Sequence, residues 1–341
     1  KFGGARRVVR GPLGHVQVLQ MDPARVDEVV AMLREAHSHD LPDDPAYVPG
    51  FEKLRILNPF PDEPGTHWVV VDGGRIVAHA ELTLPHLDNR ANAYVELTVH
   101  PLARRRGTGR LLWDHVAGLA RDDDRKLVFF EARMGAAGEA FARAIGAELG
   151  IYSARRRLVV DDAVRARVLD LEASSRAAGA GYEVVTFVGP TPAEWLDGMA
   201  YLTGRMSTDA PLENLELQPE VYDAERLRVR EEIGELRGAV MYQALAVESA
   251  TRAVVAMTNV GMTREDPTHA WQWNTIVDPG HRGHRLGTWV KVANLSRILE
   301  HDPELRTVIT WNAASNEHMI AVNEAMGFRL LDHWGEWQAR L

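Results

Sequence analysis

The sequence predicts an α/β protein built from two similar domains. Apolar runs typical of strands alternate with segments of helical periodicity along 341 residues, a length that favours two domains. A strand-loop-helix segment around Val99 recurs, altered, around Val277, about half the chain further on. We therefore expect a duplicated domain, with one copy in residues 1–160, a helical connector in 161–180 and the second copy in 181–341.

The composition limits the classes of function. The chain is 45% hydrophobic and 26% charged, carries a net charge of −9 and has no cysteine. No apolar run is long enough to cross a bilayer, so we expect no membrane partner, and the acidic balance argues against a nucleic-acid partner. Without cysteine the chain has no disulfide, thiolate metal site or cysteine nucleophile, which is compatible with the cytoplasmic location that we expect. A cationic amine substrate suits this charge balance.

The first half is expected to follow the order β-α-β-β-β-α-β-α-β. Proline and acidic residues in 38–66 indicate a loop, and Gly73-Gly74 marks a tight hairpin turn. The expected strands are 16–19, 67–71, 75–84, 92–99, 127–131 and 151–160, the last of which closes this half; the expected helices are 23–36, one that follows the loop after Val99, and 137–145.

The second half repeats this order. It is expected to have strands at 182–188, 242–247, 253–260 and 270–277, and helices at 192–206, near 220–234 and after the loop that follows Val277.

Each copy of the repeated segment passes from a strand through an arginine-rich loop into a helix. The free N–H groups and positive dipole end of a helix N-terminus suit a pyrophosphate. An ordinary tight turn with a solvated arginine cluster is the alternative.

The first loop, Arg104-Arg105-Arg106-Gly107-Thr108-Gly109, resembles the R/Q-x-x-G-x-G/A signature of the GNAT superfamily of N-acetyltransferases. The second loop keeps Arg282 and Gly287 but has Arg285 where the first glycine of the signature belongs. The resemblance implies two tandem domains with mixed central sheets flanked by helices, a layout similar to tandem acetyltransferases of the mycothiol synthase type. It also implies that acetyl-CoA, or another acyl-CoA, contacts Leu97, Val99, Arg104, Arg105, Arg106, Gly107, Thr108, Gly109 and Arg110 in the first copy and Ile276, Val277, Arg282, Gly283, His284, Arg285, Leu286 and Gly287 in the second.

The end of the second half also resembles this family. Residues 308–328 are similar to its N-x-x-A…lYeklGF ending, in which an asparagine contacts the pantetheine arm of the coenzyme. The resemblance implies that role for Asn316, and Asn312 is a second candidate. Helix capping and loop hydrogen bonding are the alternative roles for both asparagines.

Acyl transfer from a thioester requires a base for the amine proton and an acid for the leaving thiolate. The resemblance implies that Glu96, on the strand before the first loop, is the base; an ion pair with a nearby arginine is its alternative role. The family's acidic tyrosine is replaced by Ala142 in the first half and by Asn323 in the second, and Tyr152 is one substitute. The second half has Asn274 in place of Glu96, so we expect catalysis in the first half, and catalysis in the second half is the alternative. In the second half we expect coenzyme binding or a polar pocket built from Gln272, Asn274, Asn312 and Asn323.

These observations predict an acyl-CoA-dependent N-acyltransferase that acts on a small-molecule amine by direct transfer in a ternary complex. We expect no metal, because His281 and His284 lie in an arginine-rich loop that disfavours bound cations. The alternative is a non-catalytic acyl-CoA-binding sensor or partner module that has lost its proton-transfer residues. The sequence specifies neither the acceptor nor the oligomeric state.

Overall fold

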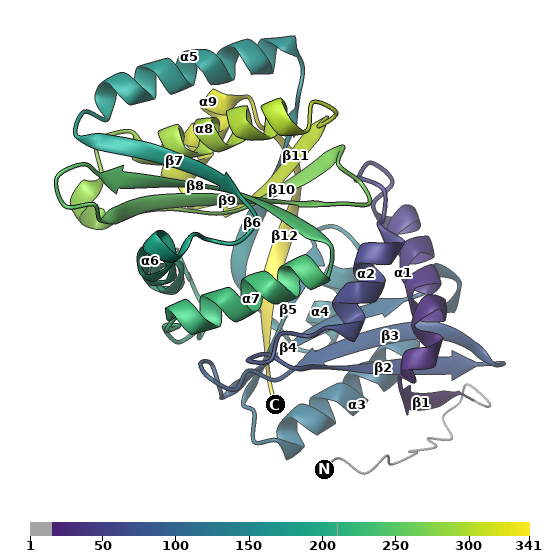
Figure 1. The fold of residues 1–341 in the computed structure, drawn as a ribbon. Coiled ribbons are helices and arrows are strands. Elements are labelled where there is room, and N and C mark those ends of the chain that lie inside the picture. Colours follow the sequence, from purple (N-terminus) through teal and green to yellow (C-terminus); the bar gives the residue numbers. More distant parts are fainter. Residues whose placement is uncertain (1–15, 210) are drawn as a thin grey trace. The chain divides into compact units, whose positions relative to one another are not determined.

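The chain forms two compact units. The computed structural model describes residues 16–209 and 211–341, and position 210 and the first 15 residues of the first predicted domain lie outside them. The first unit runs to Gly150 and includes Glu336–Leu341, and the second is Ile151–Gly335 (Figure 1). The end of the chain therefore belongs to the first unit, although it follows the second in sequence.

The first unit is a mixed sheet with helices on both faces. Strand β1 pairs with β2, β2 with β3 and β3 with β4 in antiparallel fashion, while β4 and β5 are parallel. The C-terminal end of β12 (Arg329–Arg340) follows β5 in this sheet. The other strands are β1 (Gln17–Gln20), β2 (Gly65–Asp72), β3 (Arg75–Thr83), β4 (Asn92–Val99) and β5 (Leu127–Arg133); the helices are α1 (Val26–Asp40), α2 (Pro49–Leu57), α3 (Thr108–Asp122) and α4 (Ala137–Ala144).

Each face of this sheet has its own core. Leu112, Val116 and Ala120 of α3 are fully buried against one face, together with Ala78 and Ala80 of β3. Helices α1 and α2 cover the other face with a second cluster, in which Val29, Val30 and Ile56 pack on Val69 and Ile76. Helical periodicity thus sets which side of each helix is apolar, and strand alternation assigns apolar residues to both faces.

The second unit repeats this architecture. Its strand order is β6-β11-β10-β9-β8-β7, with α5, α8 and α9 on one face and α6 and α7 on the other (Figure 1). Val292 and Ile298 of α8 pack on one face of the sheet, and Met199 of α6 packs on the other. The elements are β6 (Glu148–Val159), α5 (Asp162–Ala178), β7 (Tyr182–Val188), α6 (Leu196–Asp209), α7 (Ala224–Leu236), β8 (Ala239–Glu248), β9 (Val254–Thr263), β10 (His269–Val277), α8 (Leu286–His301), β11 (Thr307–Ala313) and α9 (Glu317–Met326).

Two sequence predictions about the first half are wrong. The segment expected to be a loop contains α2, because Pro49 is accommodated in the first helical turn and Ile56 is buried against α1. The strand expected to close the first half, 151–160, forms β6 but pairs with β11, from Ser153 opposite Ala313 to Val159 opposite Thr307. Alternation identifies a segment as a strand but does not determine its partner, since either sheet accepts the same pattern.

Candidate functional site

In the first unit, β4 and β5 begin as neighbours and then separate. Their parallel register covers only Asn92–Tyr94 of β4 and Leu127–Phe129 of β5, although the strands continue to Val99 and Arg133. Diverging strands leave facing backbone N–H and C=O groups that an extended ligand can pair with. The predicted site residues Glu96, Leu97 and Val99 all lie in the part of β4 that pairs with β3 but not with β5.

The second unit has the same divergence and a β-bulge beside it. The register of β10 with β11 ends at Gln272 opposite Thr310, and the register of β10 with β9 shifts between Gln272 and Thr275. The amide of Gln272 donates to Thr258 Oγ1 at 3.0 Å and to the Asn259 carbonyl at 2.9 Å, which fixes the bulge. A bulge bends its strand, so it directs the end of β10 away from β11.

The two arginine-rich loops share one backbone conformation. Left-handed φ angles occur at Arg105 (59°) and Gly107 (84°) in the first loop, and at Gly283 (89°) and Arg285 (56°) at the equivalent positions of the second. Each copy thus places glycine at one of the two left-handed positions and arginine at the other. Arg285 adopts the left-handed conformation, which costs a residue with a side chain about 1 kcal/mol. The second loop therefore has the same backbone conformation as the first without the signature glycine.

The first arginine of each loop holds the loop in place. Arg104 Nε donates to the Val99 carbonyl at 3.0 Å, and its two Nη atoms bind Asp40, at the end of α1, at 2.7 and 2.6 Å. Arg282 repeats this pattern, with Nε 3.4 Å from the Val277 carbonyl and Nη2 3.0 Å from Asp209, at the end of α6. Both side chains therefore point toward carboxylates of their own unit.

The remaining loop residues surround two helix N-termini. Helix α3 begins at Thr108 and α8 at Leu286, both buried, so their first-turn N–H groups have no partner within the helix. The helices begin close to the strands, since a Cβ at Gly109 or Gly287 would be in van der Waals contact with Cγ2 of Val99 or Val277, at 3.4 Å. Five arginines and one histidine of these segments are exposed: Arg105, Arg106, Arg110, Arg282, Arg285 and His284.

Glu96 lies in a cluster of charges beneath α2. Arg55 of α2 binds Glu52 at 2.6 Å, Glu81 of β3 at 2.8 Å and Glu96 at 3.2 Å. The ion pair with a nearby arginine that was the alternative role of Glu96 is therefore present. Its carboxylate nevertheless remains 72% exposed, whereas Glu52 and Glu81 are 15% and 12% exposed.

The charges of this cluster set the pKa of Glu96. The Arg55 guanidinium acts to lower it. The negative charges of Glu81 and Glu52 oppose that effect, and the pKa of Glu96 is raised above its ordinary value. On β5, desolvation and the charges of Glu336 and Glu96 raise the pKa of Glu131 to about 7.

Buried polar groups complete this face of the first unit. His67 Nδ1 lies 3.1 Å from Nε2 of His79, and desolvation together with Arg55 lowers the pKa of His67 to about 4. The hydroxyl of Tyr47 is buried and has no hydrogen-bond partner among the described residues. Sequence reasoning missed Arg55, Glu81 and Tyr47; the spacing of Glu52 and Arg55, three residues apart, was the available signal for a helical ion pair.

The asparagines of the second unit have structural partners. Asn316 caps α9, because its Oδ1 accepts from the Met319 amide at 3.2 Å, and Asn323 Nδ2 donates to Asn312 Oδ1 at 2.6 Å. The capping role is thus present for Asn316. Tyr152 lies in the second unit, where its ring stacks on His333 at 4.9 Å, so it is not a residue of the first unit.

Aromatic rings replace the charge cluster in the second unit. Trp273 of β10 and Trp311 of β11, each one residue beyond the last register pair, stack at 6.0 Å with an angle of 11°. Gly261 of β9 makes room for this stack, since a Cβ there would lie 2.7 Å from Trp273 Nε1. The two units therefore present different chemistry at equivalent places.

Comparison with known proteins identifies the family. The model of the acetyltransferase (GNAT) family matches residues 26–146. A tandem GNAT protein from the clavulanic acid biosynthesis pathway is 30% identical, with 95% of this chain and 98% of that chain covered and a TM-score of 0.77. The chain belongs to the GNAT acetyltransferase family. Because the matched GNAT protein covers both units, the chain is a tandem member of the family.

More distant solved structures share the fold. A GCN5-related N-acetyltransferase from Sphaerobacter thermophilus is 14% identical with a TM-score of 0.67, and 95% of each chain is covered. A putative acetyltransferase from Pyrococcus horikoshii is 10% identical with a TM-score of 0.61, covering 99% of this chain and 92% of that chain.

Within residues 16–209 and 211–341, no helix has the length and apolar character needed to span a membrane. The same residues contain no group of three or more His, Asp or Glu side chains that could hold a metal ion. His281 Nδ1 lies 3.0 Å from the Tyr182 hydroxyl.

Proposed function

We propose that the chain is an acyl-CoA-dependent N-acyltransferase that moves an acyl group, acetyl in the first instance, directly to a small-molecule amine. The observation that carries this proposal is the position of Glu96. Its exposed carboxylate has a raised pKa and lies on β4 beyond the point where β4 and β5 separate. A general base is most effective when its pKa lies near the working pH.

The first unit supplies the coenzyme-binding groups and the base of the proposed reaction. The α3 N-terminus and its loop bind the pyrophosphate of the coenzyme, and the unpaired edge of β4 binds the pantetheine arm. The amine nitrogen attacks the thioester carbonyl, so a C–N bond forms and the C–S bond breaks. Glu96 takes the amine proton and the leaving thiolate takes a proton from solvent, since Ala142 stands where a phenolic acid is expected.

The charge cluster favours a cationic acceptor. Glu52, Glu81 and Glu96 bring three carboxylates to a single guanidinium, that of Arg55. An ammonium group gains Coulomb energy beside them, and Glu96 can then accept its proton. We therefore propose a small aliphatic amine that is protonated in solution and bound beneath α2.

Coenzyme release with and without an added amine tests this function. Glu96→Gln removes the base but keeps the shape of the side chain, so amine-dependent release of coenzyme A from acetyl-CoA is expected to fall by 10²–10⁴-fold. Glu28→Gln is the control, because Glu28 pairs with Arg25 on the surface of the same unit. Undiminished amine-dependent release by Glu96→Gln would remove Glu96 from the reaction.

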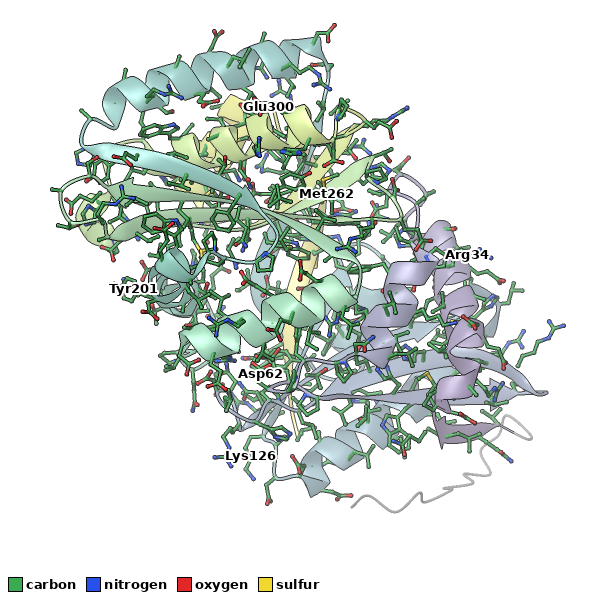
Figure 2. All side chains as sticks on the ribbon, in the orientation of Figure 1. Arg34, Asp62, Lys126, Tyr201, Met262 and Glu300 are labelled. Carbon is green, nitrogen blue, oxygen red and sulfur yellow. The ribbon has the colours of Figure 1, made fainter. Side chains whose placement is uncertain are left out.

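We also propose that both units bind coenzyme A, because both loops have the same backbone conformation. Calorimetric titration of acetyl-CoA is expected to give two sites, with Gly107→Glu removing one and Arg285→Glu the other, since each variant places a negative charge at a helix N-terminus. Arg34→Glu is the control, because it makes the same change of charge within α1 and not at a helix N-terminus (Figure 2). A single site that only one variant removes would restrict coenzyme binding to one unit.

A non-catalytic acyl-CoA-binding module is the second candidate. Asn323 stands where the second unit would need a phenolic acid, and Asn274 stands in place of a carboxylate. Such a module is expected to bind acetyl-CoA without releasing coenzyme A at any amine concentration. The release assay therefore separates the two candidates.

A further inference from the structure

The second unit contains a cavity at the start of α5. Its volume is about 410 Å³, and its walls come from the end of β6, the first turns of α5 and the start of β12. Three arginines, Arg157, Arg167 and Arg329, and a single carboxylate, Asp161, line it. The two loops assigned to the coenzyme contribute no residue to this cavity.

The charge of this cavity opposes that of the chain. The whole protein carries a net charge of −9, yet arginines outnumber carboxylates here three to one. Asp161 Oδ1 accepts from the Val164 amide at 2.8 Å and so caps α5. Two other carboxylates lie close in sequence to residues that line the cavity. Glu324 binds Arg156 at 3.0 Å, and Asp332 binds Arg155 at 2.6 Å. Asp161, Glu324 and Asp332 thus have partners other than Arg167 and Arg329.

Gly327 makes room for one of the guanidinium groups. Arg167 Nη1 lies only 2.5 Å from the position that a Cβ at residue 327 would occupy, and Gly327 has a φ of +108°. A side chain at this position would therefore displace Arg167 from the cavity. The N-terminus of α5, with its Asp161 cap, borders the same space.

We propose that this cavity binds a small, multiply charged oxyanion with phosphate or carboxylate groups. Guanidinium groups recognise both through paired, charge-assisted hydrogen bonds, and several of them around one cavity favour a ligand with more than one negative charge. Val159 and Leu330, which are 55% and 51% exposed, also line the cavity and can contact an apolar part of the ligand. The site is separate from the proposed acyl transfer and does not depend on it.

Calorimetric titration with inorganic pyrophosphate and with citrate tests the proposal. Arg167→Ala and Arg329→Ala are each expected to weaken binding of the preferred probe at least tenfold, because each removes a charged donor. Arg176→Ala is the control, since Arg176 pairs with Glu172 further along α5. Arg329 is exposed, so its variant is expected to fold even if Arg167→Ala does not.

Pyrophosphate can also bind at the two loops proposed for the coenzyme. A double variant, Gly107→Glu with Arg285→Glu, is expected to remove that binding and leave binding at the cavity. Binding that survives in this double variant and is lost in Arg329→Ala supports the proposal. Binding lost in the double variant but retained in Arg167→Ala and Arg329→Ala would overturn it, as would the absence of binding by both probes. A preference for pyrophosphate over citrate would identify phosphate as the recognised group, and the reverse would identify carboxylate.

Discussion

At the residue scale, burial distinguishes ionisable groups of the same residue type. Glu96 and Glu81 stand opposite each other on neighbouring strands, yet Glu96 is exposed and Glu81 is nearly buried against Arg55. The family resemblance implied a role for Glu96 from its place before the loop. The sequence could not identify Arg55, because that side chain reaches Glu96 only through the packing of α2 over the sheet.

Lys291 of α8 provides a residue-scale prediction. It is 2% exposed, its Nζ lies 5.7 Å from the centroid of the Phe328 ring, and desolvation lowers its pKa from 10.5 to about 7. Between these pH values the unfolded chain binds a proton that the folded chain does not, so this group makes stability rise with pH from about 7 to 10.5.

Lys291→Met is therefore expected to stabilise the protein more at pH 7 than at pH 9.5, by a difference of ~3 kcal/mol. Urea unfolding of both proteins at the two pH values measures this difference. Lys126→Met is the control, because Lys126 is exposed. An equal effect of Lys291→Met at both pH values would mean that Lys291 is charged in the folded protein.

At the element scale, the duplication is clearer in the conformation of the two loops and the helices after them than in their sequences. The strand that ends at Val99 was predicted at its observed bounds, and the loop and helix after it in their observed order, because alternation, glycine and helical periodicity all indicate them locally. The left-handed conformation of Arg285 was not predictable, since arginine rarely adopts it and only the surrounding loop enforces it. Helix α2 was missed because its single fully buried residue, Ile56, gives no helical pattern on its own.

The loop conformation predicts opposite effects of two substitutions. Arg285→Gly removes strain and is expected to raise stability by up to about 1 kcal/mol, whereas Gly107→Ala introduces strain and is expected to lower it by a similar amount. Thermal unfolding measures both. Gly118→Ala, in the middle of α3 with open space around its Cβ position, is the control for a glycine without strain and is expected to stabilise slightly. A destabilising Arg285→Gly would show that the Arg285 side chain contributes more than its backbone costs.

At the scale of the whole molecule, the two units are not two independent lengths of chain. Alternation predicted the strand at 151–160, but its partner β11 lies far along the sequence, and no local pattern records such a pairing. The last strand, β12, has no counterpart among the predicted elements. Its end lies in the first unit, where Trp337 is 1% exposed and packs with Ala132 and Ala142.

Deletion of Glu336–Leu341 is therefore expected to destabilise the first unit, although the deleted residues follow the second unit in sequence. The deletion removes Trp337 and the hydrogen bond from the Leu341 amide to the Lys126 carbonyl, at 3.0 Å. Loss of a buried tryptophan alone costs about 3–5 kcal/mol, a large fraction of the stability of a domain.

Limited proteolysis followed by mass spectrometry measures this effect. Cleavage is expected within residues 16–150 while 151–335 resists, and Trp337→Ala is expected to reproduce this pattern more weakly. Arg340→Ala is the control, since Arg340 is exposed at the end of the same strand. Equal resistance of both units after the deletion would mean that the first unit's core is complete without the end of β12.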